Sequence, residues 1–354
     1  MNTDSDNEQV VLKKIKALSK AKKIVSKKEL FSLLKETTEL LQNEITSYRK
    51  EVAEIDGMPG SLLDFTKSKK LDLIVVPDLH ARKELIYRLL TYSPEANAKT
   101  DKDDGRANST KTIFEMLCEG KLRIVFLGDI LHSETLQKER WYKAFEEYEK
   151  GNAVSQAMTD EMTDGLSTLC QVLILKKAFP ESVHCLKGNH ENIKNECANG
   201  NFAFHKFVYE GDMVLDFMVE HYGVKSVELI SQFENHLPLA AFFENVITSH
   251  AEPKREFSKS EINSSVLDPD VVYGLTWTKN DEAEENSALD MLKKNCVKNK
   301  IEKKYITGHR AVRGLYNLRA DGKVVQIHNP VQMQAAYVKD GKEFNPDEDI
   351  FRFD

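Results

Sequence analysis

The feature that most constrains this chain is a short apolar run that stops just before an Asp, Asn or His residue. The pattern occurs five times, in LIVVPDLH, IVFLGD, VHCLKGNH, NVITSH and KYITGH. These runs are rich in β-branched residues, so each predicts a short strand. Because the carboxyl ends of parallel strands meet at one edge of a sheet, the polar residues are expected to gather there.

The residues that follow these runs are suitable ligands for divalent metal ions. Carboxylate oxygens together with imidazole nitrogens favour Mn, Fe, Zn or Co over Ca. Alternate residues of an extended chain point the same way, so the first two of these residues can face one ion. The candidate ligands are Asp78, His80, Asp129, Asn189, His250 and His309.

Each candidate has an ordinary explanation when it is taken alone. Asp78 suits a strand-end turn, Asp129 a helix N-cap and Asn189 a turn. A histidine after an apolar run is most often a hydrogen-bonded residue at the edge of the core. The repeated occurrence at strand ends favours the metal site instead. The histidines outside the pattern are interpreted as structural: His184, His205, His221, His236 and His328.

Composition describes an ordinary globular chain. Its 354 residues are 41% hydrophobic and 30% charged, which suits one large domain with insertions or two domains. The net charge of -7 argues against nucleic-acid and anionic-membrane binding. The polar N-terminus resembles no signal peptide, and no run approaches the ~20 apolar residues of a spanning helix. Five cysteines without a CxxC pair favour reduced thiols, so a cytoplasmic location is expected.

Residues 1–66 are predicted to form an N-terminal helical extension. Ser26 suits a helix N-cap, and Leu30, Leu34 and Leu41 follow at helical spacing. The simpler interpretation is a helix packed on the main body. A homodimer or another partner bound through these helices is the alternative.

Residues 67–354 are predicted to form the main domain, an α/β body of two packed sheets with helices outside. Helical patterns separate the early strands, and two of them, near 135–178 and 202–235, are long enough to be insertions that cap the site. The polar segment 94–111 is predicted to be a loop. The predicted strands lie at 71–76, 122–127, 182–186, 241–248 and 303–307, followed by an antiparallel meander at 314–319, 323–328 and 334–338.

The blocks PDLHA, GDILH, GNHE, SHAE and GHR, in this order, resemble the calcineurin-like metallophosphoesterases. GNHE, and a closing Gly-His without a second histidine, look most like the phosphoprotein-phosphatase (serine/threonine phosphatase) branch. The resemblance covers roughly residues 70–330. It implies a β-sandwich of two mixed sheets flanked by helices.

The resemblance also implies two divalent ions, with Mn or Fe favoured. Asp78, His80 and Asp129 would bind one ion. Asp129 would bridge to the second, which Asn189, His250 and His309 complete. A hydroxide shared by the ions would attack the phosphorus of a phosphate ester. His190 would be the general acid that protonates the leaving group, because the pKa of a histidine is near working pH.

The chain departs from the branch in the part that handles substrate. The branch usually has Gly-Asp-x-x-Asp-Arg-Gly, whereas His132 and Ser133 stand here at the Asp and Arg positions. His132 is therefore predicted on the substrate side, and Glu134 could supply the missing carboxylate. Arg82 and Arg310 lie beside ligands and are the predicted phosphate-binding cations. Weaker candidates are Lys187, Arg140 and Arg313.

The predicted function is metal-dependent hydrolysis of a phosphorylated substrate, with a phosphate monoester favoured and a phosphoprotein suggested by the resemblance. A nucleotide pyrophosphohydrolase or a phosphodiesterase is the first alternative. A metal-binding scaffold that recruits partners through its N-terminal helices is the alternative from another class. A nuclease is disfavoured by the acidic charge.

Overall fold

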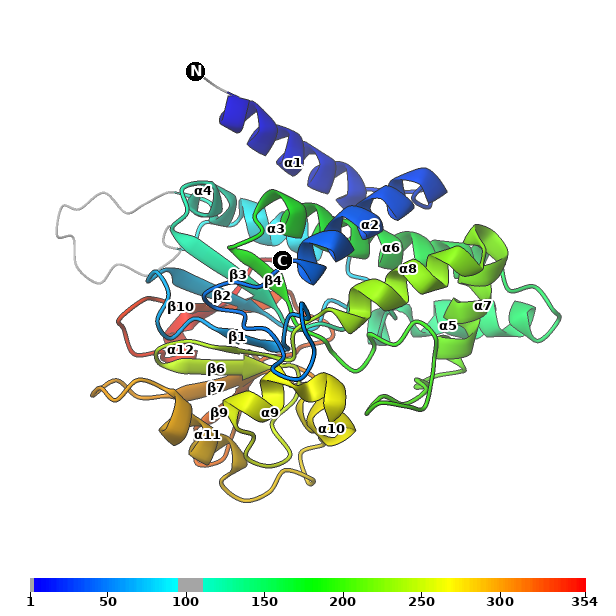
Figure 1. Cartoon of the computed structure of the whole chain (residues 1–354). Helices are drawn as coiled ribbons and strands as arrows, with labels where there is room; N and C mark the ends of the chain where they lie inside the picture. Colours follow the sequence, from blue (N-terminus) through cyan, green and yellow to red (C-terminus); the bar gives the residue numbers. More distant parts are fainter. Residues whose placement is uncertain (1–2, 95–110) are drawn as a thin grey trace.

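The computed structural model describes residues 3–94 and 111–354, and it contains two packed β-sheets with helices on both sides (Figure 1). The five-stranded sheet has the order β11 (Ile350–Arg352), β10 (Gln334–Val338), β2 (Asp72–Val76), β3 (Leu122–Phe126) and β4 (Val183–Cys185). The six-stranded sheet has the order β1 (Leu62–Asp64), β5 (Ala240–Phe242), β6 (Val246–Ser249), β7 (Lys304–Thr307), β9 (Val324–Gln326) and β8 (Asn317–Arg319). Both sheets contain parallel and antiparallel pairs, so the predicted sandwich of two mixed sheets is confirmed.

The strands are apolar on both faces because both faces are covered. In β2, Leu73 and Val75 belong to the apolar layer between the sheets, together with Ile306 of β7. Ile74 and Val76 of β2 belong instead to the core under the helices. This two-sided burial explains why the strand reads as a continuous apolar run rather than an alternating one.

Helices cover the outer face of each sheet. On the side of the five-stranded sheet lie α3 (Leu85–Thr91), α4 (Ile113–Cys118) and α6 (Gln156–Ala178). Packed on these helices or on one another are α1 (Thr3–Ser19), α2 (Lys27–Gln42), α5 (Lys138–Tyr148), α7 (Glu210–Tyr222) and α8 (Val224–Asn235). Over the six-stranded sheet lie α9 (Lys259–Asn263), α10 (Pro269–Thr276) and α11 (Ser287–Asn295). A short helix, α12 (Pro346–Asp349), precedes β11, and η1 (Thr135–Gln137) and η2 (Ser265–Leu267) are 3-10 turns. The predicted insertions are therefore helical.

The N-terminal helices are part of the main core. The Ser26 side chain caps α2 by accepting the amide of Glu29, and Leu30 and Leu34 are fully buried. Both α1 and α2 pack on α6, and α2 also packs on α8. The apolar face of α2 is consequently occupied within the chain. The helical part of the predicted extension 1–66 ends with α2 at Gln42. Near the end of the same segment the chain forms β1, which is parallel to β5.

Two strand predictions need correction. The run 241–248 is two antiparallel strands, β5 and β6, rather than one. The tail is not a single meander: β8 and β9 form a hairpin, with Asp321 and Gly322 at positive φ, but β9 is parallel to β7. Strand β10 then joins the other sheet between β2 and β11. The apolar runs show that these segments are buried, but not which sheet they join.

The topology brings two sets of strand ends to one edge. Strands β2, β3 and β4 run parallel to one another, and so do β6, β7 and β9.

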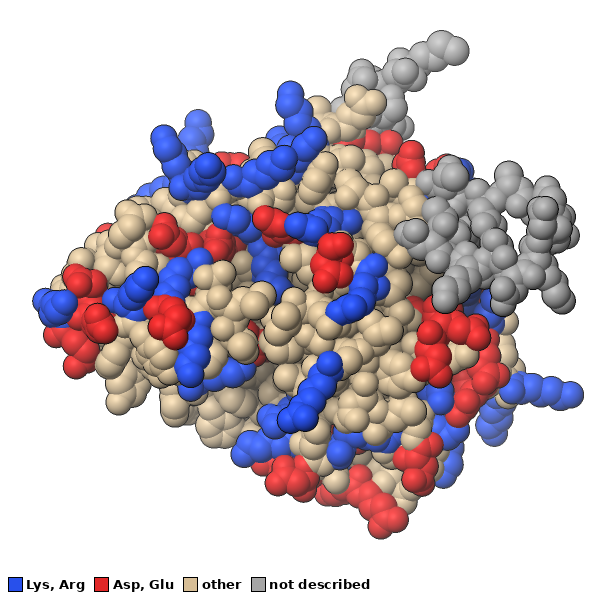
Figure 2. All heavy atoms as spheres, turned by 180° about the vertical axis from the view of Figure 1, so that it is seen from behind, with Lys and Arg blue, Asp and Glu red and all other residues tan. Residues whose placement is uncertain are grey.

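No helix of the described residues is long and apolar enough to cross a membrane. On the face shown in Figure 2, basic and acidic side chains are interspersed. Residues 95–110 of the predicted loop lie outside the described residues.

Candidate metal centre

The carboxylate of Asp129 is the hub of the site. Its Oδ2 lies 3.6 Å from His80 Nε2, 3.4 Å from His250 Nε2 and 3.6 Å from His190 Nε2. Asp129 follows β3 and adopts a positive φ of 51°, and its side chain is almost fully buried. One carboxylate oxygen therefore faces three histidine rings from three different segments.

One side of the hub carries the first strand-exit pair. Asp78 Oδ2 lies 3.7 Å from His80 Nε2, and both residues are buried. The other ring nitrogen of His80, Nδ1, lies 3.0 Å from the carbonyl oxygen of His132. A carbonyl can only accept, so Nδ1 carries a proton, and Nε2 is the ring nitrogen that faces the two carboxylates.

The remaining three candidate ligands, Asn189, His250 and His309, lie close to one another, and His250 lies beside Asp129. Asn189 Oδ1 lies 2.9 Å from His250 Nε2 and 3.0 Å from His309 Nδ1. His250 Nδ1 lies 2.9 Å from the carbonyl oxygen of Leu127, which leaves Nε2 directed at the centre. The structure thus brings together all six residues that the sequence analysis singled out as ligands.

Backbone close packing holds the strand exits together. A Cβ on Gly188 would collide with Asp129, and one on Gly308 would collide with Asp78, so only glycine fits at either position. The Glu191 carboxylate accepts the amides of Asp129 and Gly188, at 2.8 and 2.6 Å, as well as that of the residue after Asp129. Glu191 therefore orients the two loops.

Burial and mutual charge shift the acidities of these groups. Burial raises the pKa of Asp129 to about 7, against the lowering effect of His250 and His80. Burial lowers the pKa of His80, but Glu134 and Asp78 outweigh it and raise that pKa to about 9. Burial also raises the pKa of Asp78, yet the neighbouring histidines hold it below its usual range.

The residues fit a pair of divalent ions. Two buried carboxylates, an amide oxygen and several imidazole nitrogens converge, which is a donor set for Mn, Fe, Zn or Co. His309 Nε2 is buried and has no hydrogen-bond partner among the described residues. Such an unpaired polar atom costs free energy unless a ligand satisfies it.

A second histidine, His132, contacts the predicted general acid, His190. His190 Nδ1 lies 3.0 Å from His132 Nδ1, and the Phe204 ring packs on His190 with centroids 3.7 Å apart. Burial and the nearby His80 lower the pKa of His132 to about 3 and hold that of His190 well below its usual value. The two histidines form a neutral pair in place of an acid–histidine pair.

The arginines near the centre differ in whether their guanidinium groups already have hydrogen-bond or ion-pair partners. Arg82 donates to four backbone carbonyls, those of Asp78, Leu79, Asn329 and Gln332, which argues against its predicted role as a phosphate ligand. Arg140 lies at Ser133 but is paired with Glu161 and Asp164. Arg310 is exposed, and its guanidinium has no hydrogen bond or ion pair within the described part of the chain.

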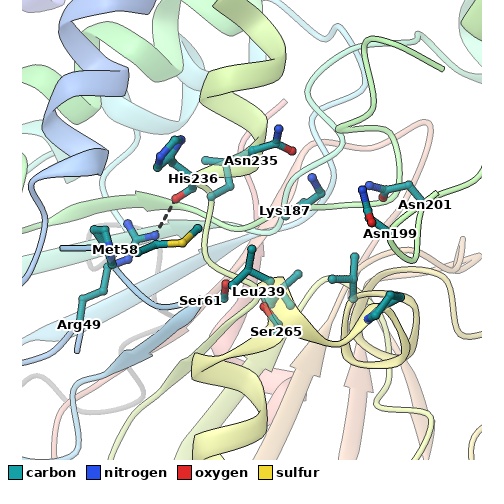
Figure 3. A pocket seen from close by; sticks show the side chains of 15 residues that line it. Arg49, Met58, Ser61, Lys187, Asn199, Asn201, Asn235, His236, Leu239 and Ser265 are labelled. Atoms are coloured by element: carbon teal, nitrogen blue, oxygen red, sulfur yellow. Dashed lines mark hydrogen bonds between the residues drawn. The ribbon is translucent and has the colours of Figure 1, made fainter. Parts of the chain in front are cut away.

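Two cavities lie near the strand exits. One, of about 220 Å³, opens beside the centre and is lined in part by His80, Arg82 and Glu134. The other, of about 360 Å³, is lined by Lys187, Asn201 and the segment in which Arg49 donates to the His236 carbonyl (Figure 3). None of the six candidate ligands, all of them described, lines it. Because Lys187 faces this second cavity, it is not positioned as the phosphate cation.

The structure adds two residues to the site. His328, interpreted from the sequence as structural, lies at the centre, with its Nδ1 3.7 Å from Asp78 Oδ2. Glu134, a guess from the sequence, lies 2.8 Å from His328 Nε2 and 3.6 Å from His80 Nε2. The run VVQIH had the same form as the five ligand blocks, an apolar run followed by a histidine.

Comparison with known proteins agrees with this geometry. Residues 71–336 match the model of the calcineurin-like phosphoesterase family. A protein serine/threonine phosphatase from Saccharomyces cerevisiae, with similarity to human phosphatase PP5, is 13% identical, with a TM-score of 0.54 over 93% of this chain and 90% of that one. A cold-active protein-tyrosine phosphatase of a psychrophile Shewanella species is 12% identical, with a TM-score of 0.47 over 83% and 82%. The first likeness bears on the fold alone, and the second is too loose to bear on it.

Proposed function

This chain belongs to the calcineurin-like phosphoesterase family, and we propose that it is a phosphatase that hydrolyses phosphate monoesters with two divalent ions bound at the strand exits. The observation that supports this proposal most strongly is the position of Asp129. A carboxylate oxygen within 3.6 Å of both His80 and His250, which belong to the two proposed ligand sets, is placed where a bridging ligand is needed.

The ligands divide into two sets around this bridge. Asp78 and His80 would hold the first ion with Asp129, and Asp129 would hold the second ion with Asn189, His250 and His309. When bound, two such ions lower the pKa of a water molecule between them and neutralise the phosphoryl oxygens. The chain's own contribution is to orient the rings, through carbonyl contacts such as that of His250 with Leu127.

His190 is proposed to protonate the leaving-group oxygen from Nε2. Its Nδ1 faces His132 Nδ1, so one of these two nitrogens carries a proton and the other accepts it. A neutral histidine stabilises an imidazolium less than a carboxylate does. His190 is accordingly protonated in a smaller fraction of molecules near neutral pH than a histidine backed by an aspartate, and leaving groups that need little protonation are favoured.

Arg310 is proposed to bind the phosphate of the substrate. It follows the ligand His309 directly, and its guanidinium is uncommitted within the described residues. A planar guanidinium donates two parallel hydrogen bonds to a phosphoryl group, which suits this task. An exposed position is compatible with a bulky substrate, and a phosphoprotein is the substrate class we propose.

A phosphodiester is the second candidate substrate, because the guanidinium of Arg140 is already ion-paired and not free to bind a phosphate. This arginine stands beside Ser133, yet Glu161 and Asp164 neutralise it. A diester carries less charge than a monoester and so needs less cationic compensation. Comparing p-nitrophenyl phosphate with bis-p-nitrophenyl phosphate under the same metal loading discriminates the two.

The proposed function is tested with Mn²⁺-loaded protein, p-nitrophenyl phosphate and phosphopeptides. Asp129→Asn is expected to lower the metal content and to reduce turnover roughly 100-fold or more. Asp160→Asn, an exposed site on α6, is the matched control and should behave like the wild type. A wild-type protein without turnover, or an Asp129→Asn variant equal to it, would contradict the proposal.

A further inference from the structure

His328 is a buried histidine on the first-ion side of the centre that no ligand block includes. It follows β9, which pairs in parallel with β7, so it leaves the sheet at the same edge as His309. Its side chain is 1% exposed, and its Nδ1 lies 3.7 Å from Asp78 Oδ2. The ring lies 5.2 Å from that of His80, centroid to centroid.

The orientation of the His328 ring is that of a metal ligand. Nε2 lies 2.8 Å from Glu134 Oε2, so Nε2 carries the proton and Nδ1 presents a lone pair. Nδ1 is fully buried and has no hydrogen-bond partner among the described residues. The rings of His80 and His250 are oriented in the same way: one ring nitrogen faces a backbone carbonyl oxygen, and the other faces the metal centre. Ligating histidines almost always have such an outer partner.

Glu134 is itself held in place. Its other carboxylate oxygen is paired with Lys206, from the loop that follows the Asn189–His190 block. The carboxylate is mostly buried, and its Oε2 also faces His80 Nε2 at 3.6 Å. Lys206 and Glu134 therefore fix His328 through its outer nitrogen.

The ordinary alternative is that His328 only neutralises Asp78. In that case Nδ1 would donate a hydrogen bond to the carboxylate, but 3.7 Å is beyond hydrogen-bond distance. The Asp78 carboxylate already accepts the His309 amide. In addition, ligand atoms of Asp78, His80 and His328 all lie within 4.8 Å of one another, as three ligands of one ion require.

We propose that His328 Nδ1 is a further protein ligand of the ion held by Asp78, His80 and Asp129, with Glu134 as the partner that orients its ring. This inference rests on the proposed two-metal function. It gives the first ion two imidazole ligands from opposite ends of the domain sequence. Added imidazole favours Fe, Zn or Co over Mn at that position.

Co²⁺ binding tests the ligand assignment, because its visible spectrum and stoichiometry are read without turnover. His328→Gln is expected to bind the first Co²⁺ at least about tenfold more weakly, with a changed absorption band. Glu134→Gln should weaken it about 10- to 100-fold. His184→Gln is the matched control, since His184 is equally buried but faces Lys176 and the Glu181 carbonyl. It should bind two Co²⁺ with the wild-type spectrum.

The outcomes separate this inference from the proposed function. If the wild type binds two Co²⁺ ions and folded His328→Gln binds both with the same affinity and spectrum, His328 is not a ligand. If the wild type binds no Co²⁺, the two-metal function falls and this inference falls with it. Circular dichroism establishes folding, and Glu134→Gln decides the case if His328→Gln does not fold. An unchanged Glu134→Gln would then overturn the assignment.

Discussion

His190 Nδ1 lies 3.0 Å from His132 Nδ1, so the proposed acid catalyst is backed by a second histidine instead of a carboxylate. Burial and neighbouring positive charge hold the pKa values of both below the usual histidine value. The centre thus combines a complete set of proposed metal ligands with a proposed proton donor that is seldom protonated near neutral pH. This combination has consequences for leaving groups, substrate binding and metal uptake.

Replacing His132 with aspartate should increase the fraction of His190 that is protonated and ready to donate. A carboxylate at this position accepts the proton of His190 Nδ1 and stabilises the imidazolium, which raises the pKa of His190. We expect kcat/KM for an alkyl phosphate to rise about tenfold or more relative to that for p-nitrophenyl phosphate. His205→Asp, at an exposed histidine, is the control. An unchanged ratio would show that His190 does not protonate the leaving group.

Arg310 should matter for substrate binding. Arg310→Ala removes the uncommitted guanidinium, and we expect kcat/KM for phosphate monoesters to fall roughly 10- to 100-fold, corresponding to the loss of a charge-assisted hydrogen-bond pair. Arg310→Lys should recover part of this loss. Arg313→Ala, at the next exposed arginine, is the control. Equal effects of the two alanine variants would rule out a specific contact.

Arg82 should matter for stability. Its guanidinium joins the β2 exit to the segment around Asn329 through backbone carbonyls, so Arg82→Gln leaves buried acceptors without donors. We expect a loss of about 2–4 kcal/mol in the free energy of unfolding, measured with urea. Arg88→Gln, in an exposed pair with Glu84, should change it by less than about 1 kcal/mol. A neutral Arg82→Gln would refute the structural role.

The positions of the proposed ligands could be predicted from the sequence because they are set locally. A strand that ends at Val76 or Phe126 and the ligand that follows it lie within a few residues of each other. The run before His328 has the same local form, but its place beside the centre depends on β9 pairing with β7. That pairing is a long-range choice which an apolar run does not encode.

The roles of charged residues were harder to predict for the same reason. Arg82 adjoins a ligand in the chain, but adjacency does not reveal that its donors reach carbonyls 247 and 250 residues away. Glu134 could be suspected from its place after Ser133, yet its partner Lys206 comes from a loop 72 residues further on. Side-chain partners of this kind follow from the packing of distant segments.

Metal uptake should become stronger as pH rises. The pKa values of Asp129 and His80, about 7 and about 9, are raised, so the metal-free centre holds protons that binding must displace. We expect Mn²⁺ affinity to increase from pH 6 to pH 9, with proton release detected by calorimetry in two buffers of different ionisation enthalpy. Affinity independent of pH would contradict these shifts.

The raised pKa of His80 also makes the stability of the metal-free protein depend on pH. The pKa of His80 is raised from 6.5 to about 9, so its contribution is fully present below pH 6.5 and is lost as pH rises through 9. The Tm of chelator-treated protein should therefore fall between pH 6.5 and pH 9. Metal-loaded protein should fall less, because ions replace the protons. A Tm that rises in the metal-free protein would reverse the assigned sign.

The most direct test of the two-metal centre is anomalous diffraction from crystals soaked in Mn²⁺. We predict two anomalous peaks about 3.5–4 Å apart on either side of the Asp129 carboxylate. One should lie beside Asp78 and His80, and the other beside Asn189 and His250. Fully soaked crystals with no peak at Asp129, or with peaks only elsewhere, would contradict the account.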